Sequence, residues 1–177
     1  MLSFKGGLKF FKKIFQKVKY RLWISRYMEY VRKIEKIVKI SEGLFVIYKS
    51  CKEPAVAPTK QQIWLYLLPS SPPNMAPLDT AVHEVRHRLQ IEKRVPLITK
   101  KELQSFPNFL KMFEEVEDKG VKEDEIDAAI CAAIGSLLLE INEVEEFRQL
   151  MLYSRLPENA KDYVKKFKVE ALLLSLH

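Results

Sequence analysis

The chain has 177 residues, a formal net charge of +7 and 47% hydrophobic residues, with only 5 glycines. That length suffices for one domain with a sizeable core, and the composition excludes a disordered or fibrous protein. Two cysteines exclude a disulfide framework, and charges interrupt every long apolar run. We therefore expect a cytoplasmic protein without a signal peptide or a membrane-spanning helix, peripheral to the membrane at most.

The positive charge is concentrated in residues 1–40, which hold twelve Lys and Arg against Glu29 and Glu35, a balance of +10. Apolar residues recur there mostly at steps of three and four, which predicts one long or two consecutive amphipathic helices. The apolar residues of this pattern are Phe4, Leu8, Phe11, Phe15, Val18, Leu22, Tyr27, Val31, Ile34 and Val38.

This pattern divides the chain into a basic helical segment, 1–42, and a second unit, 43–177. A basic amphipathic helix has three uses. It packs on its own domain, it attaches to an anionic membrane surface, or it contacts nucleic acid, which we rank last because of the aromatic content. All three remain open from the sequence.

Two short runs after Gly43 predict strands. Leu44–Tyr48 and Gln62–Leu68 are rich in β-branched and aromatic residues, and the Pro-containing connection Glu53–Lys60 lies between them. We expect two strands, arranged as a loose hairpin, before a Pro-rich break over residues 69–74. The class is α+β and mostly helical, with a small sheet ahead of the helices.

From Leu78 the chain is predicted to be helical to its end, with interruptions. A first helix starts at Asp79 or Thr80 and stops before Pro96. Its successors are a short helix opened by a capping box at Thr99–Glu102, a long helix over Lys122–Tyr153 and a last helix over Glu158–Leu176.

The sequence His83-Glu84-Val85-Arg86-His87 contains the pattern His-Glu-x-x-His. On a helix, residues four apart project from one face, so His83 and His87 can bind one metal ion. Glu84 is placed to reach a water on that metal and to act as a general base. We expect Arg86 and Arg88 to be solvated or paired with nearby acids.

Zinc in such a site requires a third protein ligand, and here a carboxylate from a later helix is the remaining choice. On the long helix one face is dominated by small residues, which allow another helix to approach closely. This face comprises Glu125, Ala128, Ala132, Gly135 and Leu139. Glu125 at its end is our first choice for the third ligand, with Asp127, Glu140 and Glu143 as alternatives.

These motifs resemble those of the gluzincin zinc metallopeptidases, in particular the minimal gluzincins and proteins similar to the peptidase domain of the IrrE regulators. The resemblance rests on His83–His87 and on Glu125-Ile126-Asp127-Ala128, and it covers roughly residues 44–150. It implies a zincin-like fold with a small sheet whose edge strand binds an extended peptide, here Ile63 to Leu68. Ala129 stands where the family has a further acid.

The leading expectation is a zinc-dependent peptidase that acts on a peptide or protein substrate, with Zn²⁺ held by His83, His87 and Glu125. In such an enzyme Glu84 takes a proton from the metal-activated water and passes it to the leaving amine. The competing expectation is an inactive or latent metal-binding module, which acts through its basic N-terminal helix on an anionic membrane or nucleic acid. In the latent form, residues 158–177 lie over the cleft.

Overall fold

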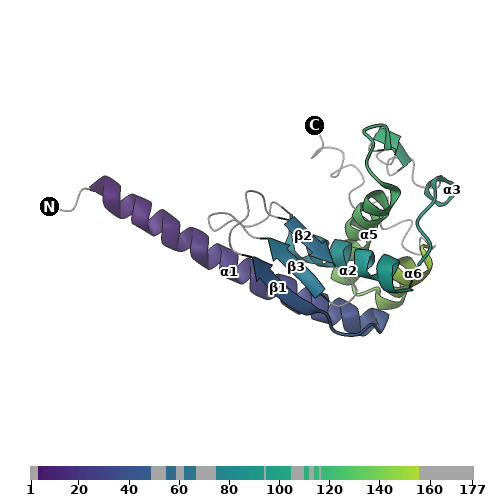
Figure 1. Ribbon diagram of the computed structural model, residues 1–177, viewed down its shortest axis with the longest axis horizontal. Helices are drawn as coiled ribbons and strands as arrows, with labels where there is room; N and C mark the ends of the chain where they lie inside the picture. Colours follow the sequence, from purple (N-terminus) through teal and green to yellow (C-terminus); the bar gives the residue numbers. More distant parts are fainter. Residues whose placement is uncertain are drawn as a thin grey trace.

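The computed structural model describes residues 4–48, 55–58, 62–66, 75–93, 95–104, 110–111, 114–115 and 117–155. Most of these residues are helical, as the sequence predicts (Figure 1). The elements are α1 (Phe4–Val38), β1 (Leu44–Tyr48), β2 (Ala55–Pro58), β3 (Gln62–Tyr66), α2 (Pro77–Lys93), α3 (Lys100–Leu103), α5 (Glu123–Glu140) and α6 (Val144–Tyr153). No described helix is both long enough and apolar enough to cross a bilayer.

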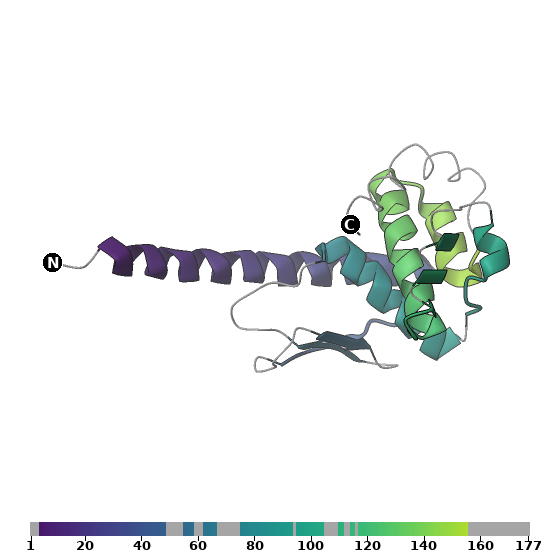
Figure 2. The same cartoon turned by 90° about the horizontal axis from the view of Figure 1, so that it is seen from above.

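Helix α1 runs unbroken for 35 residues, and its first half projects from the rest of the protein (Figures 1 and 2). Its second half packs on α2, and Tyr27, Val31, Ile34 and Val38 are fully buried there. One hydrophobic core therefore contains side chains from residues 1–42 and from residues 43–177. The predicted boundary at residue 42 does not separate two cores.

The strands differ in arrangement from the predicted hairpin. Their order is β1-β3-β2, with β1 parallel and β2 antiparallel to β3. The prediction of a hairpin is wrong because the connection between β1 and β3 contains β2, which pairs with β3 on its other side. Parallel neighbours require such a long connection. The prediction that Ile63 to Leu68 form an edge strand is also wrong for the described residues 63–66. Strand β3 is central, and both of its edges are paired.

Helix α2 is the centre of the helical part and packs against α1 on one side and α5 on the other. It begins at Pro77, earlier than expected, because proline is well suited to a first helical turn. The small and apolar residues of the predicted face of α5 are buried, namely Ala128, Ala132, Gly135 and Leu139, whereas Glu125 at its end is exposed. Gly135 shows how closely the helices approach, because a Cβ added there would lie 3.0 Å from Val82 Cγ1 and 2.9 Å from Phe147 Cε2.

The single helix predicted over Lys122–Tyr153 is divided in two. Helix α5 ends at Glu140, Asn142 adopts a left-handed conformation with φ of 63°, and α6 starts at Val144. The turn folds α6 back on α5, which buries Phe147, Leu150 and Met151 in the common core. An apolar periodicity that continues through such a turn does not reveal it.

The predicted capping box of the short helix α3 is confirmed. Thr99 Oγ1 accepts a hydrogen bond from the Glu102 amide at 3.4 Å, and the Glu102 carboxylate accepts one from the Thr99 amide at 2.8 Å. The last predicted helix, Glu158–Leu176, lies outside the described residues, as do Leu67 and Leu68.

Candidate metal centre

Helix α2 presents the two histidines of the motif one turn apart on the face toward α5. The Nε2 atoms of His83 and His87 are 3.1 Å apart, and the ring planes are at 83° to one another. Both side chains are largely buried, with 18% and 10% of their surface exposed. The i, i+4 spacing therefore does what the sequence predicts and directs both nitrogens to one point.

Glu125 in the first turn of α5 completes the group. Its Oε2 atom lies 3.4 Å from His83 Nε2 and 3.3 Å from His87 Nε2. Tetrahedral zinc with bonds of about 2.0–2.1 Å holds neighbouring ligand atoms about 3.3 Å apart. The three distances thus match one face of a zinc coordination tetrahedron. The Glu125 side chain is 51% exposed, so solvent can reach the cluster on its side.

The three alternative ligands are not in this group. The carboxylate of Asp127 is fully buried and is bound by Arg86, so it is not available to the histidines. Glu140 lies at the opposite end of α5, fifteen residues or about 22 Å along the helix axis from Glu125. Glu143 precedes α6 near that same far end. Among the described residues, only Glu125 joins the two histidines in a metal-sized group.

The hydrogen bonds of Gln90 define which nitrogen of His87 faces the cluster. Gln90 Nε2 donates to Asp127 Oδ2 at 2.6 Å and to the Asp124 carbonyl at 3.1 Å, which turns its oxygen toward His87. His87 Nδ1 lies 2.8 Å from that oxygen, so Nδ1 carries the proton and donates it. The lone pair of Nε2 is then directed at the cluster, as metal binding requires.

A buried ion pair holds α2 and α5 in this register. Arg86 Nε and Nη2 donate to the two oxygens of Asp127 at 2.6 and 2.9 Å, and both side chains have no exposed surface. Asp127 Oδ1 also accepts from the Ile98 amide at 2.8 Å. Because Asp127 binds Gln90 as well, one carboxylate joins the interhelical ion pair to the residue that orients His87.

A second buried arginine holds α2 to α1. Arg88 donates to the carboxylate of Glu35, and the same carboxylate accepts from the Gly43 amide at 2.9 Å. A Cβ on residue 43 would lie 2.7 Å from Arg88 Nη1, so any larger residue there would displace the paired guanidinium group. Both arginines are thus paired with acids, one of the two outcomes expected from the sequence, and neither is solvated.

The protonation of the motif residues follows from burial. Desolvation, and then the neighbouring His87, lower the pKa of His83 below its ordinary 6.5, against the opposing effect of Glu125. The neutral imidazole that a metal binds is therefore favoured. Burial, and then repulsion by Glu125, raise the pKa of Glu84 well above its ordinary 4.5. Glu84 Oε2 is buried without a hydrogen-bond partner among the described residues.

Sequence reasoning missed Gln90 and the structural role of Arg86. Gln90 lies three residues after His87, on the same side of the helix, so its position was a usable signal. The partner of Arg86 had no such signal, because Asp127 is 41 residues away.

Comparisons with protein-family models, with curated proteins and with solved structures found no match to this chain.

Proposed function

We propose that the protein is a zinc-dependent peptidase with a zincin-like arrangement of its metal-site helices. The observation that supports this most strongly is the convergence of His83, His87 and Glu125, whose donor atoms are 3.1–3.4 Å apart. Three nitrogen and oxygen atoms at such distances share either a proton, carried by His83 Nε2, or a metal ion. Two imidazoles and one carboxylate are the ligand set of known catalytic zinc sites, which leave the fourth position to water.

In this proposal each residue of the site has a separate role. His83, His87 and Glu125 hold the ion, and Gln90 keeps the Nε2 lone pair of His87 directed at it. Bound zinc would supply the polarisation of a water and of the scissile carbonyl. Glu84 accepts the proton of the attacking water and delivers it to the leaving amine, so that the peptide bond breaks with no net gain of protons. A raised pKa suits a group that must both take and return a proton.

The substrate in this proposal is an extended peptide that pairs with an edge strand, as the resemblance implies. With β3 central, the strand for this role is β2, which is at the edge of the sheet and contacts α2. No other described strand pairs with the second edge of β2.

The test measures zinc and hydrolysis separately on untagged protein. Wild type should contain about one zinc per chain, and His83→Ala and Glu125→Ala should lose it. Glu123→Ala, an exposed acid in the same turn of α5, is the matched control and should retain it. Glu84→Gln should keep its zinc and lose activity on a quenched fluorescent peptide pool by about 10²–10⁴-fold. Full zinc without hydrolysis of any peptide would refute the peptidase, whereas absence of zinc in wild type would refute the site.

A further inference from the structure

The projecting half of α1 carries apolar side chains that face away from the core. Ile14, Phe15, Val18 and Leu22 are 43%, 61%, 49% and 54% exposed. At about 100° per residue, these four lie within a sector of about 100°, which we call the exposed stripe. The core-facing residues of the second half are rotated from it by roughly 170°. These residues are Tyr27, Val31, Ile34 and Val38.

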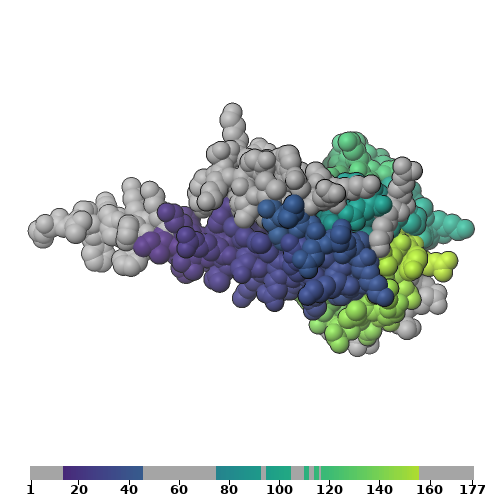
Figure 3. Space-filling model, turned by 60° about the horizontal axis from the view of Figure 1, so that its bottom comes forward, coloured from purple at the N-terminus to yellow at the C-terminus, as the bar shows by residue number. Residues whose placement is uncertain are grey.

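The regular apolar pattern of α1 thus changes face at the five-residue step from Leu22 to Tyr27. The exposed stripe lies on the opposite side of the helix from the core-facing residues. The domain that covers those residues therefore does not cover the stripe. Of the three uses expected for the basic helix, packing on the domain holds for the second half and begins at Tyr20 among the described side chains. The space-filling view shows the described part of the first half extending away from the helical body (Figure 3).

Cations border the exposed stripe on both sides. By helical position, Lys17 and Arg21 lie along one side, and Lys19 and Arg26 lie along the other. None of the four is ion-paired with an acid in the described parts of the chain, and the first acid in the sequence is Glu29. The Lys19 ammonium lies 4.9 Å from the centre of the Phe15 ring. An apolar strip with cationic margins is the arrangement that complements an anionic lipid surface.

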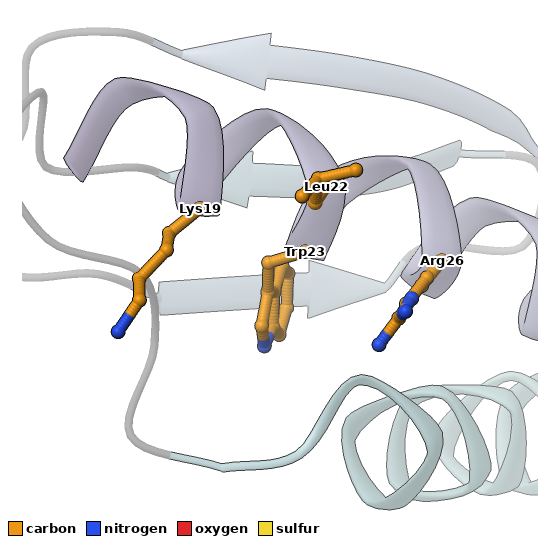
Figure 4. A pocket seen from close by; sticks show the side chains of 4 residues that line it. All are labelled: Lys19, Leu22, Trp23 and Arg26. Atoms are coloured by element: carbon orange, nitrogen blue, oxygen red, sulfur yellow. The ribbon is translucent and has the colours of Figure 1, made fainter. Parts of the chain in front are cut away.

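A pocket at one margin of the exposed stripe combines apolar and cationic side chains. It has a volume of about 270 Å³ and is lined by Lys19, Leu22, Trp23 and Arg26. Figure 4 shows Lys19 and Arg26 on either side of the Trp23 ring. That ring is held in place, since its Nε1 donates to the Met75 carbonyl at 3.0 Å. Apolar walls between two cations fit the glycerol and phosphate region of a phospholipid.

We propose that residues 14–26 of α1 bind an anionic lipid bilayer, with the exposed stripe inserted at the level of the headgroups and the flanking cations on lipid phosphates. A second copy of the chain is a poor occupant, because two such helices would bring their cations together without an acid between them. Nucleic acid is also a poor occupant, because phosphate contacts would leave the exposed stripe in water. The proposal does not depend on the metal centre.

The full chain is tested by flotation with vesicles of phosphatidylcholine alone and of phosphatidylcholine with phosphatidylserine. Binding to the anionic vesicles is expected, with much weaker binding to the neutral ones, a decline as salt rises, and no effect of a chelator. Equal binding to both vesicles, or binding to neither, overturns the proposal. Binding to duplex DNA without binding to vesicles overturns it in favour of nucleic acid.

Variants separate the contribution of the apolar side chains to vesicle binding from that of the cations. Phe15→Ser with Leu22→Ser should weaken binding to anionic vesicles by at least about tenfold, because both side chains would be buried in the bilayer. Tyr153→Ser on α6, which is 61% exposed like Phe15, is the matched control and should bind as wild type does. Lys17→Gln should weaken binding by about fivefold. Wild-type binding by the double variant, with circular dichroism unchanged, would overturn the proposal.

Discussion

Arg86 and Asp127 form a fully buried ion pair between α2 and α5, one residue from His87 and two residues from Glu125 in the sequence. Replacement of Arg86 by Met removes two hydrogen bonds to the carboxylate and further bonds to the carbonyls of Met151 and Pro96. Asp127 then remains buried, and its donors among the described residues are Ile98 and Gln90. Removal of one partner from such a pair costs about 3–5 kcal/mol in the free energy of unfolding.

That loss is a large part of the 5–15 kcal/mol by which a domain is ordinarily stable. Urea titration followed by circular dichroism measures it. Arg148→Met is the control, since Arg148 pairs with the exposed Glu145 at 3.0 Å, and such a surface pair contributes at most about 1 kcal/mol. Asp127→Asn keeps the shape of the side chain and is the milder variant if Arg86→Met is too unstable to titrate.

A double-mutant cycle tests the reasoning more sharply. Arg86→Met with Asp127→Leu removes both charges, so it should cost less than the sum of the two single changes, by about 1–3 kcal/mol. The reasoning is refuted if the two single changes add within about 0.5 kcal/mol, or if Arg86→Met costs no more than Arg148→Met.

Three further predictions concern the metal centre and the helix contact. Gln90→Leu removes the acceptor that orients His87 and should lower zinc affinity by about 10–100-fold, measured by competition with a chromophoric chelator; unchanged affinity would contradict its role. Gly135→Ala should destabilise the fold by about 1–3 kcal/mol in urea titration, because the new Cβ would lie 2.9 Å from the ring of Phe147; wild-type stability would show that the ring moves freely. In metal-free protein, Glu84→Gln should be more stable than wild type at neutral pH. A pKa that folding raises contributes stability below the ordinary 4.5, and this is lost as pH rises through the folded value, so the advantage should grow with pH in unfolding titrations; an advantage independent of pH would contradict the burial argument.

Local sequence signals predicted that His83, His87 and Glu125 lie close together. The i, i+4 spacing of His83 and His87 and the small residues on one face of α5 both follow from the helical repeat, which a sequence displays directly. The selection of Glu125 rested on the same face. The sequence could not dismiss the alternatives Asp127, Glu140 and Glu143, because all three lie on the single helix that it predicts over Lys122–Tyr153.

The chain by itself determined the helical periods, the motif spacing, the capping box at Thr99 and the concentration of positive charge near one end, since each depends on residues a few positions apart. Tertiary structure decided the rest. Arg86, which comes from α2, binds Asp127 and leaves Glu125 for the histidines. The central position of β3 and the turn at Asn142 also depend on contacts between distant segments. The helical repeat of a sequence shows which faces are apolar, but only the packing shows which face is covered. In α1 the packing covers the face of Tyr27, Val31, Ile34 and Val38 and leaves the exposed stripe uncovered.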